Sequence, residues 1–130
     1  MRTYDKFYIN GEWVEPCGKG TSEVINPANG EVSAIVPYGN ADDVNAAVAA
    51  ARNAFESWSQ TTAAERAGYL RKLAAEGEKR NADLTQTIID ELGMPIQNAA
   101  VFQVDPLGII CESYANKAAH MEEENKVGNS

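Results

Sequence analysis

Hydrophobic positions follow one period before residue 40 and another after it. Residues 6–15 and 22–37 hold short runs of aromatic and β-branched residues separated by glycine, asparagine and proline, which is typical of β-hairpins. From residue 40 onwards the apolar positions are spaced by three and four, as on one face of an α-helix. The pattern predicts an α+β piece, with two N-terminal β-hairpins followed by three to four amphipathic helices.

Asparagine–glycine pairs mark both predicted hairpins. Asn10-Gly11 interrupts the run FYINGEWV, and both of its residues accept the positive φ angles of a type I′ turn. Asn29-Gly30 belongs to the segment INPANGEV, in which Pro27 fixes its own φ and favours an extended residue before it. We expect strands at 22–26 and 31–37 to pair across this second turn.

Two capping signals open the first two helices. Asn40 is a typical N-cap with Asp43 three residues later, and Thr62 with Glu65 forms a capping box. The first apolar stripe consists of Val44, Ala47, Val48, Ala51, Phe55 and Trp58, and the second of Leu70, Leu73 and Ala74. The second stripe continues to Gly77, and glycine costs about 1 kcal/mol of helix propensity relative to alanine. Gly77 therefore marks either close packing or a weak point.

A third helix is predicted from Asn81, and it ends at Gly93 because glycine followed by Pro95 is the usual order at a helix C-terminus. Its apolar positions are Leu84, Ile88 and Leu92. A last helical stripe comprises Val101, Val104, Leu107, Cys111, Ala115 and Ala118. Pro106 interrupts this stripe, so we expect a kink or a break near Asp105.

Composition limits the class of protein. The chain has 130 residues, of which 44% are hydrophobic and 23% charged, as in an ordinary globular protein. Its net charge of −8 disfavours nucleic acid as a partner, because phosphate neutralisation requires clustered Lys and Arg. No apolar run approaches the roughly 20 residues of a membrane span, and the N-terminus lacks the apolar core of a signal peptide. We expect a cytoplasmic protein without a membrane partner.

Candidate catalytic groups are sparse. Cys17 and Cys111 fit no metal or redox spacing, and His120 has no second ligand nearby in the sequence. The acidic run 122–124 is typical of a solvated helix end, and adjacent carboxylates such as those at 90–91 point about 100° apart on a helix. The glycines of the loop before the second hairpin lack the third glycine and the following helix of a nucleotide loop. The residues themselves predict no enzyme.

The order of the motifs FYINGEWV, INPANGEV, ADDVNAAVAAARNAFESW, AAERAGYLRKLAA and ELGMP resembles the N-terminal region of the aldehyde dehydrogenase superfamily, over about residues 6–129. The resemblance implies a family fold that is α/β and Rossmann-like, and oxidation of aldehydes to carboxylic acids with NAD or NADP. In that family a cysteine attacks the aldehyde and a glutamate activates water. Those motifs and the cofactor loop lie beyond the length present, so the resemblance implies no catalytic or cofactor-binding residue here. Neither Cys17 nor Cys111 inherits the nucleophile's role.

The resemblance does imply two secondary sites. Phe102 and Pro106 match positions that line the aldehyde tunnel in relatives, although a core residue and a helix kink explain them equally well. Some relatives hold a monovalent cation with a backbone carbonyl and a carboxylate that correspond to Ile25 and Glu91. Hard cations favour such oxygen ligands, and this site would need a further ligand from outside the chain.

These observations predict a hairpin segment at 1–39, a helical segment at 40–121 and an acidic, polar tail at 122–130, which together form one incomplete domain. In the family the helices cover a parallel sheet supplied by later sequence, so their apolar stripes need another cover here. Each large side chain left in water forgoes roughly 1.5–3 kcal/mol of burial. We therefore expect self-association, or binding to a full-length relative.

Two hypotheses follow for function. In the first, the chain is an N-terminal fragment of an NAD(P)-dependent aldehyde dehydrogenase, inactive on its own and without a bound cofactor. In the second, it is a free-standing, non-catalytic interaction module related to aldehyde dehydrogenases. An assay for aldehyde-dependent NADH formation, and the coding sequence after residue 130, bear on the choice.

Overall fold

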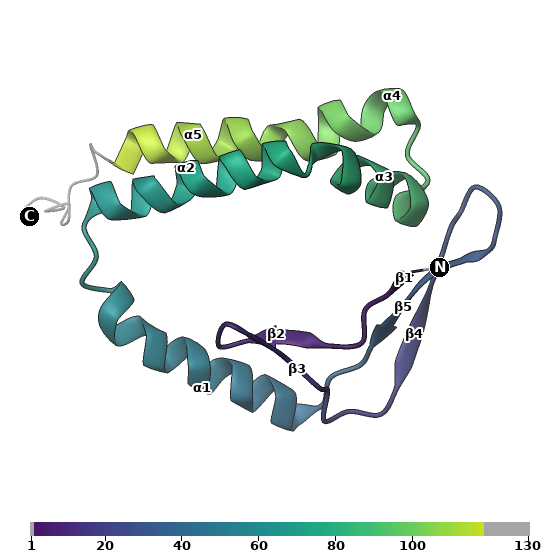
Figure 1. The fold of residues 1–130 in the computed structure, drawn as a ribbon, viewed down its shortest axis with the longest axis horizontal. Coiled ribbons are helices and arrows are strands. Elements are labelled where there is room, and N and C mark those ends of the chain that lie inside the picture. The colour runs from purple at the N-terminus through teal and green to yellow at the C-terminus, as the bar shows by residue number, and fades with distance from the viewer. Residues whose placement is uncertain (1, 119–130) are drawn as a thin grey trace, which may run out of the picture. The chain divides into compact units, whose positions relative to one another are not determined.

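The computed structural model describes residues 2–118, which form two compact units (Figure 1). Among the described residues, the first unit comprises residues 2–60 and 86–96, and the second comprises residues 61–85 and 97–118. His120, the acidic run 122–124 and the predicted tail 122–130 lie outside the described residues. None of the helices in residues 2–118 combines the length and the apolarity that a membrane span requires.

The first hairpin has the predicted turn. Strands β2 (Phe7–Ile9) and β3 (Glu12–Val14) pair antiparallel, with Tyr8 opposite Trp13. Asn10 has φ 54° and Gly11 has φ 83°, so both turn residues adopt the left-handed geometry that a type I′ turn requires. The prediction of a hairpin at Asn10-Gly11 is confirmed.

The second hairpin joins β4 (Thr21–Ile25) to β5 (Val32–Pro37) in antiparallel pairing, with a register irregularity at Val24 and Ile25. Its turn is closed by the N–H of Gly30, which donates to the carbonyl of Asn26 at 2.8 Å. Strand β1 (Arg2–Thr3) adds to β5 in parallel, giving the order β1-β5-β4. The second hairpin is thus confirmed, whereas β1 carried no sequence signal.

Helix α1 (Ala41–Trp58) begins at the predicted cap. The side chain of Asn40 accepts hydrogen bonds from the backbone N–H groups of Asp42 and Asp43. In return, the carboxylate of Asp43 accepts the N–H of Asn40 at 2.8 Å. This reciprocal pair satisfies donors that a helix N-terminus otherwise leaves free.

Helix α3 (Asn81–Leu92) ends at Gly93, which has φ 68°. A Cβ atom at Gly93 would lie 2.5 Å from Cγ of Pro27, so the end of the helix packs closely against the turn that follows β4. Residue 93 therefore needs glycine for its backbone angle and for its contact. The predicted helix and its stop are confirmed.

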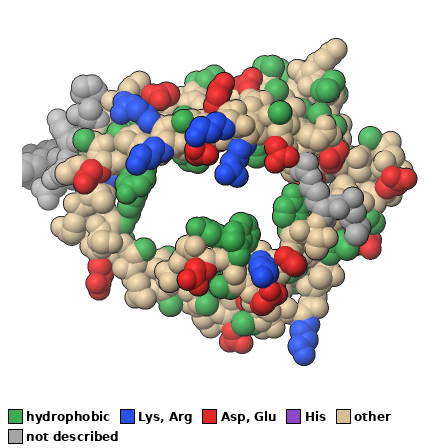
Figure 2. Space-filling view, viewed as in Figure 1, with side chains coloured by type: hydrophobic (Ala, Val, Ile, Leu, Met, Phe, Trp, Pro, Cys, Tyr) green, Lys and Arg blue, Asp and Glu red, His purple; other side chains and the backbone are tan. Residues whose placement is uncertain are grey.

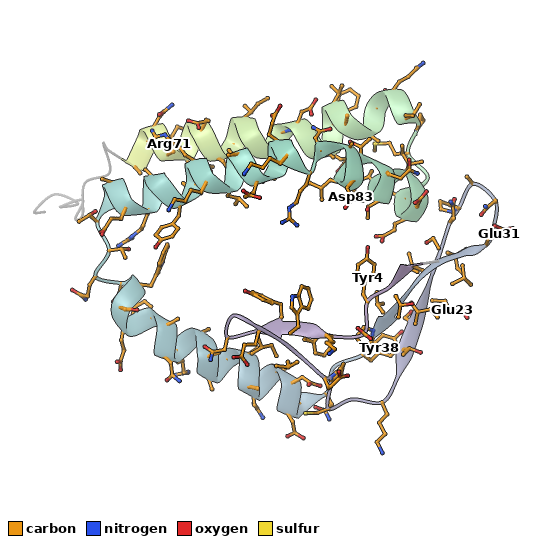
Figure 3. All side chains as sticks on the ribbon, viewed as in Figure 1. Tyr4, Glu23, Glu31, Tyr38, Arg71 and Asp83 are labelled. Carbon is orange, nitrogen blue, oxygen red and sulfur yellow. The ribbon has the colours of Figure 1, made fainter. Side chains whose placement is uncertain are left out.

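In the second unit, α2 (Ala63–Lys79) and α5 (Asp105–Ala118) lie side by side (Figure 1). Their shared core is built from Ala67, Ala115 and Ala118, with Leu70 packed against it. Arg71 reaches from α2 to α5, where it donates to Oδ1 of Asn116 at 3.0 Å (Figure 3). The small side chains let the two helices approach closely.

Close packing also explains Gly77. A Cβ atom there would lie 2.7 Å from Cδ2 of Leu107. Of the two readings of this glycine, close packing is the correct one.

A short helix α4 (Ile96–Ala99) and a π-helical segment η1 (Ala100–Val104) lead into α5. Proline lacks the N–H that an α-helix uses and its ring crowds the carbonyl four residues earlier, and the wider π turn ends two residues before Pro106. The irregularity expected near Asp105 is therefore present as a π segment that continues into α5.

Candidate functional site

Asp43 joins the loop before the second hairpin to the start of α1. Its side chain is buried, with 6% of the residue exposed. Oδ1 accepts the N–H of Cys17 at 2.8 Å, and Oδ2 accepts the N–H groups of Asn40 at 2.8 Å and Gly18 at 3.2 Å. These backbone donors, Cys17 first and then Asn40, hold the pKa of the Asp43 carboxyl below its usual range. A charged carboxylate therefore fixes this loop.

The same carboxylate acts on the thiol of Cys17, which is free and exposed. Asp43 raises the pKa of the Cys17 thiol in two ways. The larger effect is its negative charge, and the smaller is the hydrogen bond between the two side chains. Because the thiolate is the nucleophilic form, this shift of the pKa lowers the fraction of Cys17 that can act as a nucleophile. Cys111 is buried on α5, with 4% of the residue exposed.

A cavity of about 320 Å³ lies between α2 and the start of α5. Gly77 and Leu107 form part of its wall, and at its polar side Nδ2 of Asn81 donates to Oδ1 of Asp105 at 2.8 Å. The predicted tunnel residues are close by in the chain but are not part of this wall. Phe102 lies in η1 with 64% of its surface exposed, and Pro106 is half-buried on α5. Their tunnel-lining role stays a prediction.

The two predicted cation ligands lie on segments that meet. Ile25 ends β4 two residues before Pro27, and Glu91 lies two residues before Gly93, whose Cα packs against the Pro27 ring. The Ile25 carbonyl and the Glu91 carboxylate are hard oxygen donors, which suits a hard cation. Within residues 2–118 there is no group of three acidic, His or Cys side chains that could hold a metal ion. The pair alone is an incomplete ligand set, and the cation site stays a prediction.

Sequence reasoning missed two of these connections. It identified Asp43 as part of a cap but not as the anchor of Cys17 and Gly18, which lie 26 and 25 residues away. It also missed the link from Asn81 to Asp105, across 24 residues. Neither pair has a local signal, because only the tertiary fold brings such distant positions together.

The sequence model of the aldehyde dehydrogenase family matches residues 13–130. The chain belongs to the aldehyde dehydrogenase family. A relative from Staphylococcus aureus that carries an aldehyde dehydrogenase name is 50% identical over 96 residues, which cover 74% of this chain and 20% of the relative. The chain thus spans about a fifth of the length of such curated relatives.

Solved aldehyde dehydrogenase structures share the fold. The enzyme from Bartonella henselae superposes with a TM-score of 0.92 at 31% identity, over 98% of this chain and 27% of its own. An aldehyde dehydrogenase from Pseudomonas syringae, in complex with NAD+ and octanal, gives a TM-score of 0.89 at 35% identity, over 95% of this chain and 26% of its own. The predicted α+β piece and its resemblance to the N-terminal region of this family are confirmed.

Proposed function

We propose that this chain forms a non-catalytic layer of an NAD(P)-dependent aldehyde dehydrogenase that oxidises an aldehyde to a carboxylic acid. The family match over residues 13–130 is the observation that carries the proposal. The state of the two cysteines supports a non-catalytic role. Asp43 raises the pKa of the Cys17 thiol, which lowers its thiolate fraction, and Cys111 is buried. The chain is inactive on its own in this proposal.

The same proposal covers cofactor and substrate. NAD or NADP binds to parts of the family polypeptide outside this chain, and the chain alone takes up neither. The exposed ring of Phe102 is free to contact an aliphatic aldehyde, with Pro106 fixing the adjacent backbone. Ile25 and Glu91 contribute two oxygen ligands to a monovalent cation once a further ligand is supplied. Two free cysteines fit a reducing, cytoplasmic location.

A second candidate is a free-standing interaction module that binds other proteins, including further copies of itself or a full-length relative. The observation that favours it is the number of large hydrophobic side chains at the surface, among them Trp13, Phe55 and Ile109 at 67%, 66% and 71% exposure. Surfaces of this kind mark protein contacts.

A chimera tests the first proposal. This chain would replace the corresponding N-terminal region of the Bartonella henselae enzyme, and NADH or NADPH formation would be followed with an aldehyde that the intact Bartonella henselae enzyme oxidises. We expect turnover by the chimera and none by the 130-residue chain alone. Turnover by the chain alone, or a folded chimera without activity, contradicts the proposal. Tight binding of the chain to the intact relative would instead favour the interaction module.

A further inference from the structure

The tripeptide Asn-Gly-Glu occurs twice in the chain, at residues 10–12 and at residues 29–31. Both copies lie at the turn of a β-hairpin, the first between β2 and β3 and the second between β4 and β5. Asparagine is a thermally labile residue, and it is most labile before glycine, where no side chain hinders attack by the next backbone nitrogen. Because the two copies have the same local sequence, a difference in their reactivity must come from the structure.

Deamidation of an asparagine–glycine pair is an intramolecular substitution followed by hydrolysis. The backbone nitrogen of the glycine attacks Cγ of the asparagine, a new C–N bond forms, and the bond from Cγ to Nδ2 breaks. The proton of the glycine N–H leaves with Nδ2 as ammonia, and a cyclic succinimide remains. Water then opens this ring at either carbonyl, which gives aspartate or isoaspartate without oxidation or reduction. The reaction therefore needs a free asparagine side chain, a free glycine N–H and access of water.

The second copy is held by hydrogen bonds. Glu31 lies at this turn (Figure 3), where its N–H donates to Oδ1 of Asn29 at 2.9 Å and its Oε2 accepts from Nδ2 of Asn29 at 3.2 Å. The N–H of Gly30 donates to the carbonyl of Asn26 at 2.8 Å, so the attacking nitrogen is engaged as well. These hydrogen bonds must open before Gly30 can reach Cγ of Asn29.

The first copy is less restrained. Asn10 is exposed, and within residues 2–118 neither its side chain nor the N–H of Gly11 makes a hydrogen bond. A Cβ atom added at Gly11 would meet nothing within 4 Å, so the space beside the attacking nitrogen is open. A groove of about 390 Å³ between this turn and the alanines of α1 leaves room for water on the other side of the turn.

The hairpin around Asn10 is also less firmly held than the hairpin around Asn29. β2 and β3 form a two-stranded sheet of three residue pairs, whereas β4 and β5 share five pairs and carry β1 on β5. Two-stranded hairpins are marginally stable on their own in water. Figure 2 shows hydrophobic side chains at the surface over the β2–β3 hairpin, where Tyr8 and Trp13 are 63% and 67% exposed. Little burial therefore opposes the backbone rotation that brings Gly11 towards Cγ of Asn10.

We propose that Asn10 is a site of covalent modification, at which the chain deamidates through a succinimide with Gly11, and that the fold protects Asn29 from the same reaction. Water is the co-reactant, ammonia is released, and the products are aspartate and isoaspartate at position 10. This inference goes beyond the proposed function and does not depend on it, because the reaction needs only the β2–β3 turn.

The modification changes the hairpin that carries it. Either product adds a negative charge to the turn. Isoaspartate also inserts Cβ into the backbone of a two-residue turn, so the type I′ geometry, with φ 54° at Asn10 and 83° at Gly11, is lost. The pairing of Tyr8 with Trp13, whose ring centroids lie 5.2 Å apart, depends on that turn. The β2–β3 hairpin therefore loses its pairing as isoaspartate accumulates.

The test is peptide mapping of the full 130-residue chain during incubation at mildly alkaline pH. Trypsin cleaves after Lys and Arg, so Asn10 and Asn29 fall on separate peptides, residues 7–19 and 20–52. Mass spectrometry detects the replacement of the amide by a carboxyl group, and fragmentation locates it and distinguishes isoaspartate from aspartate. We expect Asn10 to deamidate at least about tenfold faster than Asn29, because the hydrogen bonds at Asn29 must open first. Equal rates, or a faster rate at Asn29, would overturn the proposal.

The unfolded chain separates the effect of the structure from that of the sequence. In concentrated urea both Asn-Gly-Glu copies should deamidate at rates within about twofold of each other, since their local sequences match and the hydrogen bonds at Asn29 are absent. If Asn10 reacted as selectively in urea as in the folded chain, the proposal would be overturned, because the selectivity would not come from the fold.

Asn10→Gly is the non-reactive variant, because Gly-Gly also forms a type I′ turn and has no amide to lose. Near-ultraviolet circular dichroism reports on the packing of Tyr8 and Trp13. On incubation the wild type should lose part of this signal in proportion to its isoaspartate content, whereas Asn10→Gly should keep it. Asn29→Gly is the matched control at the second turn, and its signal should fall as in the wild type. An equal loss in Asn10→Gly, or a stable signal in Asn29→Gly, would contradict the role of Asn10.

Discussion

The carboxylate of Asp43 accepts three backbone N–H groups, from Cys17, Gly18 and Asn40. These bonds favour the charged form, so the pKa of Asp43 is lower in the folded protein than in the unfolded chain. Stability from a lowered carboxyl pKa is fully present above the unfolded value, about 3.9, and is lost as the pH falls through the folded value. Asp43 therefore stabilises the fold at neutral pH and not in strong acid.

Replacing Asp43 by asparagine should lower the thermal midpoint by several degrees near pH 7, because the anionic acceptor is lost. The gap to the wild type should narrow as the pH falls below about 4 and close once the pH has passed the lowered folded-state pKa, where the wild-type carboxylate is protonated as well. Thermal unfolding followed by circular dichroism checks both points. Asp42→Asn is the control, since the exposed Asp42 lies on the same helical turn. A gap that persists unchanged in acid would contradict this role of Asp43.

The same substitution should make Cys17 more reactive. Removing the charge of Asp43 removes the main cause of the raised pKa of the Cys17 thiol, so more thiolate is present at mildly alkaline pH. Alkylation by iodoacetamide, followed by mass spectrometry, should be several-fold faster in Asp43→Asn than in the wild type. Cys17→Ser assigns the signal, because the remaining Cys111 is buried. An unchanged rate would show that Asp43 does not control this thiol.

Substitutions at two glycines of α2 test how closely α2 packs against α5. Gly68 has no atom within 4 Å of an added Cβ, so Gly68→Ala should raise the free energy of unfolding by about 1 kcal/mol. Gly77→Ala should raise the free energy of unfolding by less than Gly68→Ala does, because the end of the Leu107 side chain must move towards the adjoining cavity. Gly77→Val should lower stability by about 1–3 kcal/mol through overpacking. Denaturant unfolding of the three variants measures these differences, and equal gains for both alanines would contradict the close contact at Gly77.

The elements that the sequence predicted correctly are those whose signals are local. Asn10-Gly11, the caps at Asn40 and Thr62, and the stop at Gly93 each depend on residues within a few positions. The sequence did not decide between close packing and a weak point at Gly77, because the side chain that packs against it, Leu107, lies on another helix. Strand β1 was missed because its two residues gain their conformation from pairing with β5.

Less of the candidate site than of the fold could be predicted from the sequence. Phe102 and Pro106, and the pair Ile25 and Glu91, came from resemblance to a family and not from their own pattern. The structure adds that the segments carrying Ile25 and Glu91 meet at the contact of Pro27 with Gly93. A sequence of 130 residues carries no signal for side chains or ligands that other parts of a polypeptide contribute.

At the scale of the molecule, the notable feature is how little of it is buried. Among the described residues, the buried hydrophobic positions are mostly alanines, namely Ala34, Ala67, Ala99, Ala115 and Ala118, together with Val104 and Cys111. No large side chain among the described residues is fully buried. Aromatic and branched side chains supply most of the burial energy in ordinary cores. The exposure of the larger apolar residues in the described part of the chain supports the proposal that they form a contact with another polypeptide segment.

Amide hydrogen exchange of α1 tests this claim most directly. Exchange would be measured in the isolated chain and in the chimera with the rest of the Bartonella henselae enzyme. Because the apolar side chains of α1, among them Val44, Val48 and Phe55, are exposed in the isolated chain, we expect the amides of residues 44–58 to exchange there at least about a hundredfold faster than in the chimera. Equal protection of these amides in both proteins would contradict the account, since α1 would then be stable without a cover.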